Sequence, residues 1–426
     1  MQKIHNRNTV RYFALITIFF VFLFFTTDFG LIDIQKTAII LAVGIDRDQE
    51  DFIVCSQIAI PKSSDQGQAT NAVQIVSRGK TVAEAFEDIN AKTGWYPKLV
   101  FCNLILLGKE TVKQNVFDAL DYFLMDEYLS DNCLLATCND NASDLLNAAA
   151  LVDDASSAAI EKVLSPHAER VGSVFTSTLH TFAIGYYADD SCGMLPIVKL
   201  QNQQEPDGET APNVKTPPNQ NEQSGAGQES EQKAEEGQEG QSSAQKQSGA
   251  SSAQNKPVFS AGETALFKHG KKVGELNPEE TFAANAVLNK LRLAPYSITT
   301  PDTQTPCSLS IKQNAPKIKL KVAKNGMASL KIHLTLTAGL LDYAKARPAQ
   351  DVKDVGNVPT GAFSAAQKKL AGEILALFEK TRALDCDIFS LRDRYRKTGN
   401  PSFPKYEANL LQNTVAEVDV RFQNVR

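Results

Sequence analysis

Histidine, cysteine and acidic residues are the side chains of this 426-residue sequence that could do chemistry, and their spacing decides which chemistry is open to them. The five histidines stand far apart, at positions 5, 167, 180, 269 and 333, and none has metal-ligand spacing from a cysteine. The sequence contains no G-x-S-x-G elbow, S-x-x-K, phosphate-binding P-loop or H-E-x-x-H. It therefore predicts no catalytic residue, no metal ligand and no cofactor-binding residue, and indicates a protein that is not an enzyme.

The acidic run from Asp46 to Asp51 is the segment closest to a calcium-binding loop. Such a loop needs glycine at its sixth position and a bidentate acid at its twelfth. Here Asp51 occupies the sixth position and Phe52 re-enters an apolar run, so we interpret the segment as the polar tip of a hairpin.

The seven cysteines are odd in number and show no repeating spacing, which argues against a disulfide framework. Most have apolar neighbours, which predicts buried free thiols. Cys133 and Cys138 are five residues apart on one predicted strand, where their side chains point to opposite faces, so we predict no bridge between them.

The N-terminal segment 1–30 places Lys3, Arg7 and Arg11 before an apolar run at 12–25, which predicts export with the bulk of the chain outside the cytoplasm. Fourteen helical residues span about 21 Å, less than a hydrocarbon core of about 30 Å, as in a removable signal peptide. Counted on to Ile32, the segment spans about 31 Å, enough for a membrane anchor. The lack of a convincing A-x-A-like cleavage site favours the anchor, while the cleaved peptide remains an alternative.

The composition of the rest of the chain indicates two folded parts separated by a segment of low apolar content. The net charge of −5 provides no basic field for nucleic acid. Residues 201–256 are rich in Gln, Ser, Glu and Gly and contain Val214 as their one large apolar residue, which predicts a disordered linker or an insertion loop. The linker separates two parts, 31–200 and 257–426, each long enough for its own core.

The first part predicts a mixed α/β sheet. Its elements follow in the order strand, helix, strand. The expected strands are 37–46, 51–60, 72–77 and 99–108, and the expected helices begin at 82 and span 111–125, with Leu124 among the inward residues of the second. Helices at 142–151 and 156–164, with short strands near 174–187 and 194–200, leave open a second lobe beyond a boundary near residue 140.

The second part predicts an α+β domain with antiparallel strands and long helices. A hairpin at 263–276 precedes Asn277, which with Glu280 forms a capping box that opens a helix to about Leu291. Alternating strands are expected at 307–314, 316–324, 328–338 and 414–425, and helices at 364–384 and 388–395. The whole chain is therefore expected to be of the α+β class, following an N-terminal membrane segment.

Several segments match one family in order along both parts. They are LIDIQKTAIILAVGIDRDQEDFIVCSQIAIP with its G-I-D step, SRGKTVAEAFEDINAKTGWYPKLVFCNLILLGKE, FDALDYFLMDEYLSDNCLLATCNDNASDLL, ETALFKHGKKVGELNPEETFAANAVLNKL, DIFSLRDRYRK and VDVRFQNV. In these segments the sequence resembles the Ger(x)C spore germination proteins, which are the C subunits of nutrient germinant receptors.

The resemblance implies a non-catalytic, outward-facing subunit at the spore inner membrane, assembled with A-type and B-type receptor subunits and needed for germination in response to nutrients. It transfers no site residue and assigns no small-molecule site. Such proteins are usually lipoproteins, but the first cysteine here is Cys55, inside a predicted strand, so the leader itself is the simplest tether. The alternative is an exported, membrane-anchored scaffold or cell-wall-associated protein outside germination.

The sequence offers one candidate docking surface, which consists of Lys317, Lys319 and Lys321 on an exposed strand edge. Edges of this kind can pair with a partner strand. The other interpretation, a solvated face that its charges protect from pairing, is the one that the sequence favours.

Overall fold

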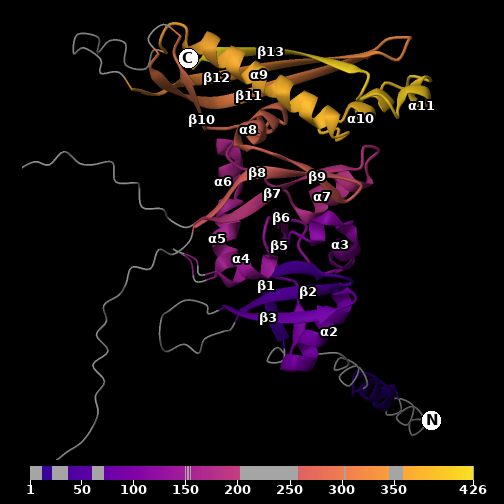
Figure 1. Cartoon of the computed structure of the whole chain (residues 1–426). Helices are drawn as coiled ribbons and strands as arrows, with labels where there is room; N and C mark the ends of the chain where they lie inside the picture. Colours follow the sequence, from indigo (N-terminus) through magenta and orange to yellow (C-terminus); the bar gives the residue numbers. More distant parts are fainter. Residues whose placement is uncertain are drawn as a thin grey trace, which may run out of the picture.

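The chain folds around two β-sheets that lie one beyond the other along the long axis of the molecule (Figure 1). The structure is a computed structural model, and it describes residues 12–21, 37–59, 72–148, 150, 153, 155–201, 258–301, 304–344 and 358–425. Within these residues one sheet has nine strands and the other has four. We call them the N-terminal sheet and the C-terminal sheet.

The N-terminal sheet has the strand order β3-β2-β1-β5-β6-β7-β8-β9, with β4 also paired to β1. Its strands are β1 (Thr37–Asp48), β2 (Asp51–Ala59), β3 (Ala72–Gly79), β4 (Tyr96–Lys98), β5 (Leu104–Leu107), β6 (Leu134–Cys138), β7 (Cys192–Gln201), β8 (Val258–Lys268) and β9 (Lys271–Leu276). The central strands β1, β5, β6 and β7 run parallel, whereas the hairpins at either side are antiparallel. A mixed sheet forms, as the sequence predicts.

Helices cover both faces of this sheet, which explains the unbroken apolar runs of its central strands. One face packs against α2 (Val82–Thr93), α3 (Phe117–Leu124) and α7 (Leu179–Tyr187). The opposite face packs against α4 (Ala142–Asn147) and α5 (Ser156–Val163), and α6 (Pro166–Val171) follows. In β5 all four residues are therefore buried, Ile105 toward the first face and Leu106 toward the second.

The predicted start of α2 at Thr81 and Val82 is confirmed, but the capping box that Thr81 and Glu84 would form is only half present. The Thr81 hydroxyl accepts a hydrogen bond from the Glu84 N–H, and the Glu84 carboxylate accepts one from the Lys80 N–H. Val82, Ala85, Phe86 and Ile89 form the buried face. The helix ends at Gly94, whose φ of 71° suits a residue without a Cβ.

The position of β8 and β9 differs from the sequence-based division. The predicted 263–276 hairpin exists, but it continues the N-terminal sheet, because β8 pairs antiparallel with β7 from Gln201↔Val258 onward. The change of sheet therefore follows β9 and does not coincide with the predicted division at 256–257. Gln201 closes β7, and the rest of the predicted 201–256 linker lies outside the described residues.

The C-terminal sheet has the order β10-β11-β12-β13, with β10 (Ala294–Thr299), β11 (Pro306–Val322), β12 (Ala328–Tyr343) and β13 (Thr414–Asn424). The first three strands are antiparallel, which confirms the prediction for the pairing of β11 with β12. The last strand runs parallel to β12, since α9 (Ala362–Ala383), α10 (Leu391–Arg396) and α11 (Phe403–Tyr406) precede it and return the chain to the same end of the sheet.

One face of the C-terminal sheet is covered and the other faces solvent. Leu330, Ile332 and Leu334 of β12 are buried under α9, whereas His333 between them is exposed. The helix α8 (Pro278–Val287) lies between the two sheets (Figure 1) and packs against β8 on one side and α9 on the other. Its predicted capping box, formed by Asn277 and Glu280, is confirmed.

Several predicted boundaries are wrong, each for a local reason. The helix expected at 111–125 is a short 3-10 turn, Thr111–Lys113, followed by α3, because the Val116 N–H donates to the Gly270 carbonyl at 2.9 Å. Leu124, predicted to face inward, is partly exposed. The helix expected to reach Leu291 ends at Val287, where the chain turns through Asn289 at φ 63°.

The predicted strand near 174–187 is also wrong. Residues 179–187 form α7, because Thr178 caps the Thr181 N–H and the apolar residues Leu179, Phe182 and Ala183 recur at helical spacing. The option of a second lobe beyond residue 140 is likewise wrong, since β6 and β7 on either side of that position pair with each other.

The strands predicted at 307–314 and 316–324 are one strand, β11, which continues through Pro316. Pairing with β10 ends at Ile311, so Pro316 lies on an open edge where its missing N–H breaks no ladder bond. The strand β10 itself was not predicted. The predicted helices at 364–384 and 156–164 and the closing strand are present within a few residues.

Candidate interaction sites

The aspartates of the acidic run at the first hairpin have two different roles. Asp48 and Asp51 form ion pairs with Arg78 near the tip, where the prediction of a polar hairpin holds. Asp46 is buried instead, and its carboxylate accepts hydrogen bonds from the N–H groups of Ala142 at 2.7 Å and Ser143 at 3.0 Å. Asp46 therefore fixes the first turn of α4 against β1.

A glycine makes room for this anchor. A Cβ at Gly108 would lie 1.8 Å from Asp46 Oδ1, and one at Gly44 would lie 3.0 Å from Leu146. Gly108 is therefore required for the Asp46 contact, and a side chain at Gly44 would press on α4. The G-I-D step at Gly44 to Asp46 thus has a structural role.

The histidines are dispersed in the structure as in the sequence. His167, His180 and His269 are exposed, and His333 Nδ1 lies 3.2 Å from Asp419 Oδ2 on the outer face of the C-terminal sheet. His5 lies outside the described residues. In the part of the chain that the structure describes, no three His, Cys, Asp or Glu side chains gather in a way that could hold a metal ion.

A cleft of about 470 Å³ opens beside the amino ends of β5 and β6. Its lining is mostly apolar, and its charged residues are Glu161, Glu169 and Lys290. The Lys290 ammonium lies 2.5 Å from Glu169 and 3.9 Å from the centre of the Phe175 ring. Burial raises the pKa of Glu161, which accepts a hydrogen bond from Asn103. The cleft therefore has room for a small molecule that is largely apolar and carries a few polar groups.

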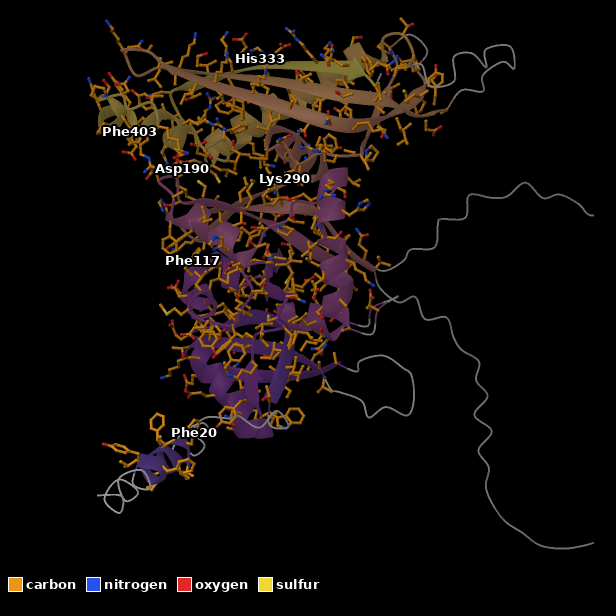
Figure 2. The ribbon with its side chains drawn as sticks, turned by 180° about the vertical axis from the view of Figure 1, so that it is seen from behind. Phe20, Phe117, Asp190, Lys290, His333 and Phe403 are labelled. Atoms are coloured by element: carbon orange, nitrogen blue, oxygen red, sulfur yellow. The ribbon has the colours of Figure 1, made fainter. Side chains whose placement is uncertain are left out.

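The second feature is a charged contact between the two sheets, which we call the junction and define as residues 189–192 together with 385–396. Figure 2 shows Asp190 between the sheets. Arg392, almost fully buried, lies 3.5 Å from Asp190 and 3.6 Å from Asp385, and it donates to the Glu407 carbonyl at 3.2 Å. Arg396 adds a more exposed ion pair with Asp189 at 3.0 Å. These pairs hold the C-terminal helices to the N-terminal sheet.

Two buried carboxyl groups meet in the junction. Burial, and then the nearby Asp387, raise the pKa of Asp190 to about 8. Burial also raises the pKa of Asp387, although its carboxylate accepts hydrogen bonds from the N–H groups of Leu391 at 2.5 Å and Arg392 at 3.2 Å. Both carboxyl groups of the junction therefore hold a proton more tightly than an exposed aspartate does.

A cavity of about 260 Å³ adjoins the junction. Its walls come from α7, from the start of β7 and from the 387–390 loop, and they include Ile184, Cys192 and Asp387. Cys192 is half-buried, whereas the other six cysteines are buried, as predicted for most of them. Cys133 and Cys138 lie on opposite faces of the N-terminal sheet, which confirms that prediction too.

Exposed aromatic residues gather at the opposite end of the N-terminal sheet. Trp95, Tyr96, Phe101 and Tyr128, which we call the aromatic patch, are each at least 37% exposed. The Lys98 ammonium lies 5.0 Å from the centre of the Tyr128 ring and links the two segments. Trp95 and Tyr96 stay exposed because β4 lies beside only the first three residues of β1.

The outer face of the C-terminal sheet is polar and accessible. Lys317, Lys319 and Lys321 are exposed on β11, and cross-strand register places Lys319 opposite Lys331. Beyond them, Lys331 forms an ion pair with Glu417 at 2.6 Å. The lysines thus occupy the open edge that the sequence predicts.

The leader is described only at residues 12–21, which are helical with exposed apolar side chains, among them Phe20 (Figure 2). The remainder of the predicted 1–30 segment lies outside the described residues. Across the described ranges, no helix combines the length and the apolar character needed to cross a membrane.

Sequence reasoning missed the junction and both cavities. Cys192 and Asp387 are separated by 195 positions, and only the pairing of β7 with β8 and the return of α9 bring them together. The one local signal was the Asp-Asp step at 189–190, directly before an apolar strand.

Comparison with known proteins gives two family matches. A model described as the spore germination protein N-terminal domain matches residues 31–200, and one described as spore germination B3/GerAC like, C-terminal, matches residues 262–424. Among solved structures, the chain is similar to one titled "Crystal Structure of the GerBC protein", with 16% sequence identity and a TM-score of 0.48 over 90% of this chain and 97% of that chain. No curated protein matches the sequence.

Proposed function

Because this chain belongs to the GerAC-like family of spore germination proteins, we propose that it is the C subunit of a nutrient germinant receptor. The observation that carries the proposal is that both family models match, in order, and together cover most of the chain. In this role the protein works by contact with A-type and B-type subunits and catalyses no reaction.

The test is co-purification from spores. The tagged full chain, extracted from spore inner membranes in mild detergent, is expected to retain A-type and B-type subunits, identified by mass spectrometry. The same tag on an unrelated exported membrane protein is the control. Recovery of the chain alone, and only from growing cells, would overturn the proposal and support the alternative of an anchored scaffold or wall-associated protein outside germination.

The leader is proposed as the tether that holds both sheets on the outer side of the membrane. Its apolar run follows three basic residues, and the described residues 12–21 present exposed apolar side chains that water does not favour. Replacing residues 1–30 with a cleavable secretory signal is expected to release the protein from the membrane. Retention of the released form, in the absence of receptor subunits, would show that the leader is not the tether.

The aromatic patch is proposed to face the bilayer. Tyr96 pairs with Thr37, five residues after Ile32, and five extended residues reach about 17 Å. Tryptophan and tyrosine favour the membrane–water interface. Trp95 is the one tryptophan of the chain, so brominated lipids should quench its fluorescence in vesicles carrying the full chain. If the protein stays in the vesicles and Trp95 is not quenched, the tether holds and the patch faces elsewhere.

A further inference from the structure

Two cysteines from different parts of the chain lie close together in the junction. Cys192 begins β7, and Cys386 lies in the turn after α9, next to Asp387. The Asp387 N–H donates to Cys192 Sγ at 3.2 Å, and Cys386 Sγ lies 3.6 Å from the Phe267 carbonyl of β8. Because Phe267 pairs with Gly193, these contacts bring both cysteines to the start of β7.

The surroundings make the two thiols unequal. The hydrogen bond from Cys386, and then the positive charge of Lys268 and the Asp387 N–H, lower the pKa of Cys192 in spite of its burial. The same hydrogen bond and burial raise the pKa of Cys386. Since the thiolate is the nucleophile, Cys192 is the reactive member of the pair and Cys386 is its proton-bearing neighbour.

Cys192 is also more accessible to reagents than Cys386 is. Cys192 lines the 260 Å³ cavity beside α7, whereas Cys386 is fully buried and is absent from that lining. A small reagent that enters the cavity therefore meets Cys192 first. Cys386 can react only with a sulfur atom already bound at Cys192.

We propose that Cys192 and Cys386 form a modification site for low-molecular-weight disulfides, and that its product is an internal disulfide joining the two sheets. The Cys192 thiolate attacks one sulfur of the reagent RSSR, which forms a mixed disulfide and releases RS⁻. Cys386 then loses its proton, and its thiolate attacks the Cys192 sulfur and expels a second RS⁻. Two protein thiols are oxidised and one RSSR is reduced to two RSH.

A second thiol pair within the same chain serves as a comparison. Cys102 and Cys133 also share a hydrogen bond, but both are buried in the core of the N-terminal sheet, and neither lines the cavities described above. The contact with Cys102, and then burial, raise the pKa of Cys133. This pair should remain reduced while the junction pair reacts, although the two pairs have similar thiol contacts.

The experiment uses the reduced full chain in detergent, exposed to oxidised glutathione and then to an alkylating reagent. Non-reducing peptide mapping should find a Cys192–Cys386 bridge, with Cys192 lost about tenfold faster than Cys102 or Cys133. The variant Cys386→Ser should accumulate a glutathione adduct at Cys192, and Cys192→Ser should leave Cys386 unmodified. The matched control Cys102→Ser should still form the bridge.

Other outcomes overturn the proposal. A bridge at Cys102–Cys133 that forms first, or equal loss of all cysteines, would show that the junction is not selective. A stable adduct at Cys192 in the unmodified sequence would show that Cys386 does not resolve it. Circular dichroism and thermal melting establish that each variant is folded, and the bridged form should melt at a higher temperature because the bond constrains the unfolded chain.

Discussion

The two sheets differ in how many of their faces are covered by helices. The N-terminal sheet is packed on both faces, so consecutive residues such as Leu104 to Leu107 of β5 are all buried. The C-terminal sheet is packed on one face, and β12 alternates between buried and accessible residues along its length. The first sheet therefore has no free face among its central strands, while the second presents one to solvent or to a partner. In the proposed role, which depends on contact with partner subunits, the C-terminal sheet is therefore the one with a face open to a partner.

The largest expected effect on stability comes from alanine substitutions at adjacent positions of β5 and of β12, which test this comparison. Ile105→Ala and Leu106→Ala should each lower the free energy of unfolding by about 2–5 kcal/mol, because they lie in cores on opposite faces. In β12, Ile332→Ala should cost a similar amount and His333→Ala less than about 0.5 kcal/mol. Urea unfolding measures all four. A mild effect of Leu106→Ala would contradict two-sided packing of the first sheet.

The junction can be broken at Arg392. Replacing Arg392 by Met should lower the free energy of unfolding by about 1.5–3 kcal/mol, because the carbonyls of Glu407 and Ala408 lose their charged donor. Arg396→Met is the matched control, since its side chain is 54% exposed and its ion pairs should contribute at most about 1 kcal/mol.

Hydrogen exchange locates the effect. In Arg392→Met, amides at the start of β7 and in α10 should exchange faster, while those of β1 and β5 should be unchanged. A uniform increase in the exchange rate across both sheets would mean that they unfold as one unit. The two sheets would then not differ in local stability.

The carboxyl pair predicts a pH dependence. The pKa of Asp190 is about 8 in the folded protein and has an ordinary value of 3.8 when exposed, so the folded state holds this proton more tightly. The resulting stability is fully present below the unfolded pKa and is lost as the pH rises through the folded pKa. We expect unfolding to become easier by about 4 kcal/mol between about pH 5 and about pH 9. Asp190→Asn should flatten this dependence, and an unchanged slope would contradict the raised pKa of Asp190.

Local patterns predicted most elements because the signals for them are local. The Thr81 and Asn277 caps and the alternation along β12 and β13 depend on residues within a few positions. The α7 segment was mistaken for a strand, since Thr176, Thr178 and Thr181 favour strands while the spacing of Leu179, Phe182 and Ala183 favours a helix.

Long-range pairing could not be predicted in the same way. Nothing near Val258 indicates that it pairs with Gln201 across a segment of low apolar content, so the hairpin of β8 and β9 was assigned to the second part. For the same reason, Asp46 was placed at a hairpin tip, when its partners are N–H groups 96 and 97 positions later. The junction depends on both kinds of contact and was missed entirely.

The smallest expected effect on stability concerns the accessible face itself. Lys317, Lys319 and Lys321 line an open edge, and Lys319 lies opposite Lys331. Exchanging the three for Glu replaces the like charges of Lys319 and Lys331 with opposite ones, whereas Lys317 faces His333 and Lys321 faces Ser329. The free energy of unfolding should therefore change by less than about 1 kcal/mol.

Partner binding should respond to the same exchange much more strongly than stability does. If this face carries a docking surface, the Glu variant should retain less of the A-type and B-type subunits during co-purification from spores, because partner acids that complement lysine would meet repulsion. Lys80→Glu with Lys109→Glu, on exposed positions of the N-terminal body, is the matched control and should leave recovery unchanged. Equal losses in both variants would show a general effect of charge, and full recovery in both would show that the lysines only protect the edge from pairing.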